Sequence, residues 1–279
     1  MLNTIYRDAV KKRNDMLLSI KGPNFDHILE QARKNWIEYT PRKKNVAIAG
    51  IDSSFNCVKF QGLELWVVTA ISAASDGEII ADLHDHGIGY ASNSLSSLAA
   101  KMEIKACEMS VDKTDLVLVD GSLYSQFMTR QKKLSLPITN IMKKNQNVIF
   151  ISKTSNTRTQ FIGLKSNASD IFYYNHATKK PGFSAIFTDS RYGKDKLISS
   201  IFVRLSESTP IIKLEFFGNI HSENDVKQTI DKIYKNSICG YPYALKLAHQ
   251  KCKISNNDLA KLVSLYGLSN EIGSREVLE

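Results

Sequence analysis

The N-terminal part of the chain has the apolar spacing of amphipathic helices. Apolar side chains such as Ile5 and Trp36 recur there every three or four positions, which places them along one face of a helix. Gly22 and Pro23 interrupt this spacing and end the first helix. We therefore predict an N-terminal helical arm over residues 1–40. Its apolar face is expected to pack in the core, and the alternative is a docking or dimerisation surface.

Short, continuous apolar runs replace the helical spacing after Pro41, and such runs are typical of buried strands. The turn signal Asp76-Gly77 joins two of them, so three adjacent antiparallel strands are expected in this part of the chain. Ser92 or Asn93 is expected to cap the helix that follows. The predicted order is strands over residues 46–52, 58–72, 78–84, 115–120, 147–153, 197–205 and 211–217, with helices over 92–109, 223–234 and 242–251.

Three antiparallel strands, a covering helix and then parallel strands alternating with helices form the order of a ribonuclease-H-like sheet. We therefore predict an α/β fold in which residues 41–279 form a ribonuclease-H-like mixed sheet with flanking helices. The N-terminal helical arm precedes this domain, and C-terminal helices end it. Residues 154–196 are polar with scattered aromatic side chains, and we expect an irregular insertion there on the rim of the sheet.

The charge of the chain favours a polyanionic partner. Lys and Arg number 37 against 28 Asp and Glu, which gives a net charge of +9. An excess of this size attracts nucleic acid at neutral pH. The longest nearly apolar stretch, residues 66–74, is too short for a membrane-spanning helix, and Met1 opens a polar segment without the core of a signal peptide. We therefore expect a cytoplasmic protein with no membrane partner.

Two of the predicted strands end in a carboxylate, Asp52 and Asp120. A charge at the end of a buried strand is costly unless water, a hydrogen bond or a cation meets it. Two such carboxylates, with a third from the covering helix, can hold Mg²⁺ or Mn²⁺ ions about 4 Å apart and position both oxygens of a phosphodiester. For the third acid, helix geometry favours Glu103, which lies nearer the buried face than Glu108. Both remain candidates, because a long side chain can reach the site from either position.

Two other patterns compete with this carboxylate site. Asp82, His84 and His86 alternate along a strand and point to one side of the sheet, as ligands of zinc or manganese do. A polar exit from the strand is the favoured interpretation of these residues. Ser122 follows the second strand-end acid, but it lacks the G-x-S-x-G pattern of a serine nucleophile. Neither pattern displaces the carboxylate site.

Four stretches of the sequence resemble the NurA family, nucleases that act with the hexameric translocase HerA in the processing of DNA ends. They are residues 49–54 (AGIDSS), 116–123 (LVLVDGSL), 149–153 (IFISK) and 240–249 (GYPYALKLAH), and the closing GSREVLE agrees with them. Each stretch alone has low specificity, whereas the ordered set, which extends from about residue 45 to the end of the sequence, is specific.

The resemblance implies a Mn²⁺-dependent nuclease, with Mg²⁺ as the alternative ion, that works as a homodimer around a central DNA channel. Carried over by position, Asp52 and Asp120 match the metal ligands that the family places at strand ends. Glu103 matches the glutamate on its helix. Tyr241 and His249 match its late active-site pair.

Tyr241 and His249 also have an interpretation from their spacing. Pro242 opens the helix between them, so Tyr241 lies at the helix entrance and His249 about two turns along. His249 is a candidate to ligate metal or to transfer a proton to the leaving oxygen, with a hydrogen-bonded core histidine as the alternative. Lys153, at a strand exit, and Arg130, in a basic cluster, are candidate contacts to substrate phosphates.

The residues and the resemblance together predict a metal-dependent DNA nuclease. The expected activities are a 5′ to 3′ exonuclease and a single-strand endonuclease, acting in the resection of double-strand breaks with a HerA-type translocase. A non-catalytic nucleic-acid clamp or adaptor is one alternative, and it does not require Asp52 and Asp120 to converge. A ribonuclease of the same fold is the other, since recognition of a 2′-hydroxyl depends on groove contacts that the sequence does not locate.

Overall fold

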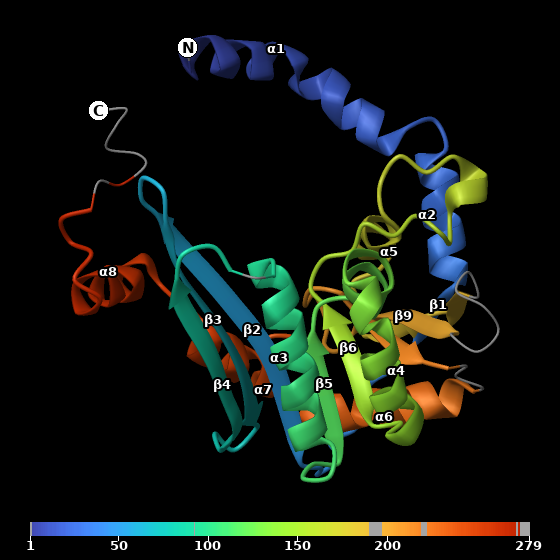
Figure 1. Cartoon of the computed structure of the whole chain (residues 1–279). Coiled ribbons are helices and arrows are strands. Elements are labelled where there is room, and N and C mark those ends of the chain that lie inside the picture. The colour runs from blue at the N-terminus through green and yellow to red at the C-terminus, as the bar shows by residue number, and fades with distance from the viewer. Residues whose placement is uncertain (1, 92, 190–196, 219–221, 272, 274–279) are drawn as a thin grey trace.

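One mixed sheet forms the centre of the structure, a computed structural model that describes residues 2–91, 93–189, 197–218, 222–271 and 273 (Figure 1). The strands of this sheet are β1 (Trp36–Glu38), β2 (Ile48–Lys59), β3 (Glu64–Ala74), β4 (Ile79–Ile88), β5 (Leu116–Asp120), β6 (Val148–Ser152), β7 (Gly182–Ser184), β8 (Phe187–Asp189), β9 (Ile198–Arg204) and β10 (Ile212–Phe217). Their order is β1-β7-β9-β10-β6-β5-β2-β3-β4, and β8 pairs with β9. A small separate hairpin is formed by β11 (Ser237–Ile238) and β12 (Tyr241–Pro242).

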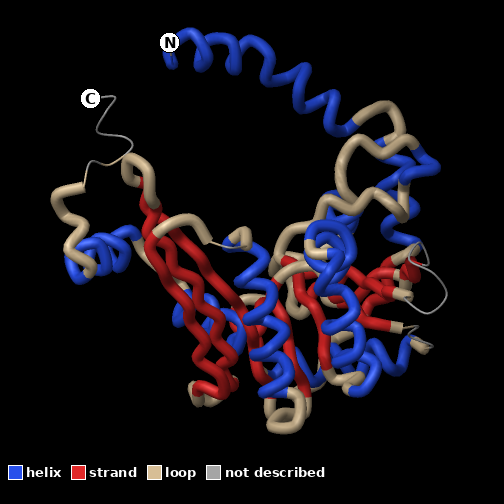
Figure 2. The backbone as a smooth tube through the Cα atoms, in the orientation of Figure 1, coloured by secondary structure: helices blue, strands red, loops and turns tan. Residues whose placement is uncertain are grey.

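Helices and helical turns pack on both faces of the sheet, whereas α1 extends away from it (Figure 2). The α-helices are α1 (Leu2–Lys21), α2 (Phe25–Lys34), α3 (Leu95–Ser110), α4 (Ser135–Lys144), α5 (Asp170–Ala177), α6 (Glu223–Lys235), α7 (Tyr243–Cys252) and α8 (Asn256–Leu265). The shorter turns are the π-helical η1 (Tyr124–Arg130) and the 3₁₀-helical η2 (Lys132–Leu134) and η3 (Ile162–Leu164). None of the helices in the described part of the chain is long and apolar enough to cross a membrane.

The central strands are buried on both faces, which explains their continuous apolar runs. Along β5, Val117 and Val119 pack with α3, α4 and η1, whereas Leu116 and Leu118 pack with α6 and α7 on the opposite face. Successive side chains of a strand point to opposite faces, so a strand covered on both sides needs apolar residues at every position. This burial keeps β5 and its neighbours rigid beneath the polar residues that follow them.

The strand pairing confirms the predicted fold class, a mixed α/β sheet with flanking helices. β2, β3 and β4 pair antiparallel, and β2, β5 and β6 pair parallel. The predicted strands and the helices α3, α6 and α7 all occur, most of them near their expected bounds, but β2 continues to Lys59 and β3 begins only at Glu64. The helix cap is a small difference: Ser94 caps α3 by accepting from the backbone N–H of Ser97, in place of the expected Ser92 or Asn93.

The N-terminal arm differs in part from its prediction. α1 has no buried residue, so the apolar side chain of Ile5 is exposed and does not pack in the core. α2 does pack there, through Ile28, Leu29 and Ala32. Trp36 is buried as well, but it lies in strand β1 and pairs with Ser184 of β7, because the chain has already joined the edge of the sheet at that point.

The segment over residues 154–196 is more ordered than its polar sequence indicates. Its described part, residues 154–189, contains α5, β7 and β8, and the remainder lies outside the described residues. Three of its aromatic side chains, Phe161, Tyr173 and Tyr174, are fully buried against α2. The prediction of an irregular segment was therefore wrong for the part that forms α5, β7 and β8, because the aromatic residues pack with α2 into a hydrophobic cluster.

Candidate metal centre

Asp52 and Asp120 lie at the same level of the sheet on two adjacent strands. The parallel pairing of β2 with β5 ends at Ile51 and Val119, so the two aspartates are the next residues on adjacent strands. Asp120 ends β5 as predicted. Asp52 does not end β2, which continues to Lys59 because its pairing with β3 persists after the pairing with β5 has stopped. The two carboxylates nevertheless converge at the point where the strands separate.

His249 reaches the same point from helix α7, which lies directly on β2. A Cβ atom at Gly50 would lie 2.3 Å from backbone atoms of Ala244 and Leu245, so only glycine permits this approach. Nδ1 of His249 lies 2.7 Å from Oδ2 of Asp52. One ligand atom each from Asp52, Asp120 and His249 all lie within 4.8 Å of one another. His249 therefore belongs to this group of three side chains, and its side chain, which is 57% exposed, does not lie in the core.

Two further side chains contact Asp120. The hydroxyl of Tyr241 donates to Oδ1 of Asp120 over 3.1 Å, and Nζ of Lys153 donates to Oδ2 over 2.9 Å. Nζ of Lys153 also lies 4.8 Å from the centre of the Tyr241 ring, which adds a cation–π contact. Burial, and then the charge of Asp120, raise the pKa of the Tyr241 phenol, so this group stays a hydrogen-bond donor. The pair Tyr241 and Lys153 thus holds the second carboxylate in place.

Glu103 lies beside this group without joining it. Its carboxylate accepts from the hydroxyl of Ser53 over 2.5 Å and from the side-chain amide of Gln126 over 2.5 Å. Burial raises the pKa of Glu103 to about 8, and the charges of Asp52 and Asp120 act in the same direction. Those two charges lie close enough to affect the titration of Glu103.

The structure distinguishes the two candidates for the third acidic residue, Glu103 and Glu108, by their burial. Glu103 faces the sheet and is buried, whereas Glu108 is exposed on the outer side of α3. Ser53 and Gln126 were missed by the sequence analysis. Ser53 follows Asp52 within a matched stretch, and that position was its only signal, whereas Gln126 lies on the π-helical η1, whose geometry the sequence does not indicate.

The residues at this site fit a divalent cation. Burial and the neighbouring charge of Asp120 raise the pKa of Asp52, so the two carboxylates repel each other in the absence of a shared positive charge. Carboxylate oxygens suit Mg²⁺ and Mn²⁺, and an imidazole nitrogen suits transition metals, so a mixed set of this kind is suited to a divalent metal ion. Lys153 supplies the positive charge nearest to Asp120 in the described structure.

The competing residues do not form a second centre. Among the described residues, Asp52, Asp120 and His249 form the one group whose geometry suits a metal, and Asp82, His84 and His86 are not among them. The latter three lie within the exposed strand β4, and Nδ1 of His86 contacts the hydroxyl of Tyr266 at 2.6 Å. Ser122 donates to the carboxylate of Glu215, and Arg130 lies at the exposed end of η1, in the wall of a neighbouring cavity.

Comparisons with known proteins agree on one family. Residues 46–254 match the family model for the NurA domain. A DNA double-strand break repair nuclease NurA from Sulfurisphaera tokodaii is 20% identical over an alignment of 331 residues that covers 97% of each protein. The corresponding protein of Saccharolobus solfataricus is 25% identical over 96% of each.

Solved structures show the same fold. The crystal structure of the NurA nuclease from Sulfolobus solfataricus superimposes with a TM-score of 0.79 at 22% sequence identity, over 96% of this chain and 97% of that chain. A crystal structure of NurA bound to dAMP and manganese gives a TM-score of 0.66 at 11% identity, over 94% of this chain and 97% of that chain.

Proposed function

The chain belongs to the NurA family of nucleases, and on that premise we propose that it is a Mn²⁺-dependent deoxyribonuclease that hydrolyses phosphodiester bonds. The convergence of Asp52, Asp120 and His249 carries the proposal. A nucleic-acid clamp has no need for two carboxylates from distant parts of the chain to meet at one point, whereas a metal-dependent nuclease does. Mg²⁺ is the alternative ion.

Some side chains of this site would bind the cation, and others orient the residues that bind it. Asp52, Asp120 and His249 would hold the cation, and Glu103 completes the acidic surroundings from α3. When bound, the cation supplies Lewis-acid chemistry that activates water and neutralises charge on the phosphate. Tyr241 fixes the orientation of the Asp120 carboxylate through its hydroxyl. With these roles assigned, the exposed side chains of His249 and Lys153 remain to contact the substrate.

We propose that two exposed side chains, His249 and Lys153, act on the substrate itself. The side chain of His249 is 57% exposed and engages Asp52 through Nδ1, which leaves Nε2 to face the substrate or the ion. In the first case it can donate a proton to the leaving oxygen. Lys153 is bound to Asp120, and its ammonium group can transfer to the scissile phosphate when a cation takes over the neutralisation of that carboxylate.

The cellular role that we propose follows the relatives. Curated relatives are described as DNA double-strand break repair nucleases, and one solved NurA structure holds dAMP and manganese. We infer that the substrate is DNA, both single strands and duplex ends, and that the net charge of +9 contributes to its binding. A 5′ to 3′ exonuclease with single-strand endonuclease activity, working in the cytoplasm in end resection with a HerA-type hexameric translocase, is the role that fits the resemblance.

A homodimer is the proposed assembly, and helix α1 supports it. This helix of 20 residues has no buried side chain, yet it carries exposed apolar residues that include Ile5, Val10 and Leu17. Most of the stability of a helix in a protein comes from the packing of its apolar face, so a surface that covers the apolar side of α1 stabilises it. α1 extends away from the sheet (Figure 1), where a second copy of the chain can reach it.

The test of the proposed function is a cleavage assay on end-labelled DNA. Single-stranded DNA, duplex DNA and RNA of the same sequence are incubated with the purified protein, with Mn²⁺, with Mg²⁺ or with EDTA. We expect cleavage of DNA with Mn²⁺ and none in EDTA. Asp52→Asn and Asp120→Asn should each abolish cleavage, whereas Asp76→Asn, an exposed change in the β3–β4 turn, should not. Cleavage by either active-site variant at the wild-type rate would contradict the proposal, and preference for RNA would favour the ribonuclease alternative.

A further inference from the structure

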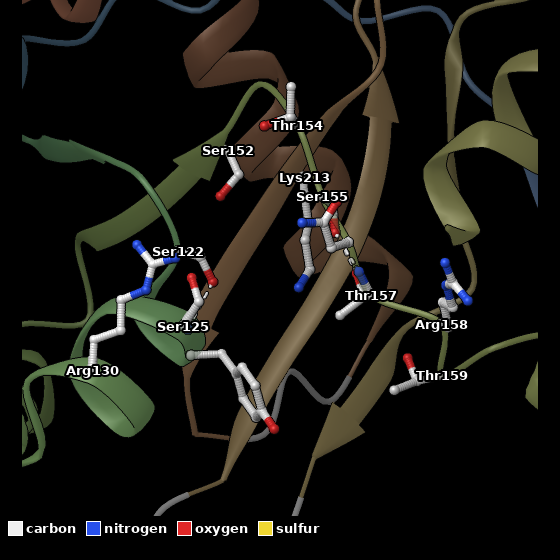
Figure 3. A pocket seen from close by; sticks show the side chains of 12 residues that line it. Ser122, Ser125, Arg130, Ser152, Thr154, Ser155, Thr157, Arg158, Thr159 and Lys213 are labelled. Carbon is white, nitrogen blue, oxygen red and sulfur yellow. Dashed lines mark hydrogen bonds between the residues drawn. The ribbon is translucent and has the colours of Figure 1, made fainter. Parts of the chain in front are cut away.

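A polar cavity of about 410 Å³ lies beside the metal centre (Figure 3). Its walls come from the start and end of η1, from the C-terminal end of β6 with the segment that follows it, and from β10. Ser122 and Ser152 line the cavity, and they come two residues after Asp120 and one residue before Lys153. The cavity therefore adjoins the site where the phosphodiester would be cleaved.

The charged side chains that line the cavity are all cationic. Arg130, Arg158 and Lys213 are among the lining residues, and none of the lining residues that the structure describes is acidic. Figure 3 shows the two guanidinium groups on opposite sides, with the Lys213 side chain between them. Most of the other lining residues are serines and threonines, whose hydroxyls can donate hydrogen bonds. A cavity with this lining favours an anion with several oxygen atoms.

A buried hydroxyl in the wall of the cavity lacks a partner of its own. Ser152 is 6% exposed, and its Oγ has no hydrogen-bond partner among the described residues. A buried polar group without a partner is unfavourable, and such groups are rare in folded proteins. The Oγ of Ser152 points into the cavity in Figure 3. A ligand oxygen in the cavity would supply the missing partner.

The floor of the cavity, formed by Ser152 and Lys213, is held in place by strand pairing and by an ion pair. Lys213 is the register partner of Ser152 on the neighbouring strand, and both are buried. Nζ of Lys213 lies 2.5 Å from Oε1 of Glu215. The other carboxylate oxygen of Glu215, Oε2, accepts from the hydroxyl of Ser122 and from the backbone N–H of Tyr124. These bonds satisfy Glu215 and tie the start of η1 to β10. The ammonium group is thus fixed in position before any ligand arrives.

The wall that carries Arg158 is also held in place. Asp170, at the start of α5, accepts from the backbone N–H groups of Thr159 and Gln160. Its own backbone N–H donates to the carbonyl oxygen of Thr157. The loop that brings Arg158 to the cavity is therefore anchored on both sides of the arginine, which limits the entropy lost when a ligand binds.

We propose that this cavity binds a phosphate group of the nucleic-acid strand, at a position separate from the phosphodiester that is cleaved. The proposal rests on the proposed function and adds a second point of contact for the same substrate. Arg130 and Arg158 would neutralise the phosphate from the rim, and Ser152 would donate its unpartnered hydroxyl from below. With the strand held at two points, the metal centre receives the next phosphodiester in a fixed register.

The test measures DNA binding in EDTA, so that it does not depend on cleavage. The cavity variant is the double change Arg130→Gln and Arg158→Gln, both at exposed positions that tolerate substitution. The matched control, Lys232→Gln with Lys235→Gln on α6, removes the same charge and does not touch the cavity. Dissociation constants for a labelled single strand are measured at several salt concentrations, and circular dichroism checks the fold.

We expect the cavity variant to bind single-stranded DNA roughly tenfold more weakly than the wild type, because it loses hydrogen bonds to a charged group. The dependence of log K on log salt should become less steep by about 0.7, the value for one phosphate contact on a single strand. Ser152→Ala should weaken binding about fivefold without lowering the melting temperature. Equal losses in the cavity variant and the α6 control, or unchanged binding by Ser152→Ala, would overturn the proposal.

Two substrates distinguish the source of the phosphate. If the cavity holds a terminal phosphate, a strand with a 5′-phosphate binds the wild type more tightly than the same strand with a 5′-hydroxyl, and the cavity variant loses this difference. If it holds an internal phosphodiester, both strands bind the wild type equally, and the variant weakens both. Cleavage of DNA by the wild type with Mn²⁺ tests the proposed function separately, so failure of the nuclease activity and failure of the cavity give different results.

Discussion

Nδ1 of His249 lies 2.7 Å from Oδ2 of Asp52, although 197 positions separate the two residues in the chain. The contact joins the C-terminal part of α7 to the middle of β2, and it is possible because Gly50 lets the helix backbone rest on the strand. The Asp52 side chain is 11% exposed and the His249 side chain 57% exposed. Asp52 is therefore buried, and the residue that it binds, His249, is accessible to solvent.

Replacement of His249 should affect metal binding far more than folding. The side chain is mostly exposed, so we expect His249→Ala to keep the wild-type melting temperature in EDTA within about 2 °C. Mn²⁺ affinity, measured by isothermal titration calorimetry, should fall by roughly 10- to 100-fold with the loss of one ligand. Lys251→Ala, an exposed change on the same helix, is the control. An unchanged Mn²⁺ affinity in His249→Ala would place this histidine outside the coordination sphere.

The burial of Glu103 gives the metal-free protein a characteristic pH dependence. The pKa of Glu103 is raised from 4.5 to about 8 in the folded state, so the folded state binds the proton more tightly than the unfolded chain does. Its contribution to stability is fully present below pH 4.5 and is lost as the pH rises towards 8. The loss amounts to roughly 3 kcal/mol at pH 7.

Glu103→Gln should remove this pH-dependent contribution. In urea denaturation with EDTA, the free energy of unfolding of the wild type relative to the variant should fall between pH 5 and pH 8. The variant should also lose Mn²⁺-dependent cleavage if Glu103 completes the site. Glu108→Gln, an exposed change on the same helix, should follow the wild type in the denaturation measurement. Parallel pH profiles for Glu103→Gln and the wild type would contradict the assignment of a buried, protonated carboxyl at neutral pH.

Much of the fold could be predicted because the central strands are buried on both sides. The continuous apolar runs that end in Asp120 and Ser152 form few structures in a folded protein other than a buried strand. The helical periodicity of α3 distinguished the buried Glu103 from the exposed Glu108. The aspartate in β2 was placed with less accuracy. Its strand continues past Asp52 because β3 supplies a pairing partner that a local apolar pattern does not describe.

The contacts that could not be predicted are those between elements distant in the chain. Gln126 bonds to Glu103 from a π-helical turn, and Lys213 meets Ser152 only because β10 lies antiparallel to β6. No local pattern encodes either neighbour. The same reason explains the ordered part of residues 154–189, where Tyr173 and Tyr174 become core residues because α2, β1 and β9, all distant in the chain, pack against them.

The close approach of α7 to β2 predicts that Gly50 tolerates no side chain. A Cβ atom would overlap backbone atoms of Ala244 and Leu245 at 2.3 Å, and backbone atoms cannot rotate away as a flexible side chain does. Gly50→Ala should therefore displace α7, lower the free energy of unfolding by about 3 kcal/mol, and reduce cleavage through movement of His249.

Gly163→Ala provides the control for this substitution. A Cβ atom at Gly163 would meet nothing within 4 Å, and the residue is exposed. Urea denaturation and the Mn²⁺-dependent cleavage rate should both distinguish the two variants. If Gly50→Ala is as stable and as active as Gly163→Ala, then α7 is not held against β2 as closely as the contact distances indicate.

Removal of α1 separates assembly from folding. The helix contributes no buried side chain to the described structure, so a chain that begins at Gly22 should keep the circular dichroism of the sheet and a melting temperature within a few degrees of the full chain under dilute conditions. If the exposed apolar side of α1 is covered by a second copy, the full chain should sediment as a dimer and the shortened chain as a monomer.

The substitutions Ile5→Glu and Val10→Glu, both on exposed positions of α1, should give the same result without deletion. Dimers that persist in both the shortened and the doubly substituted protein would exclude α1 as the dimer contact.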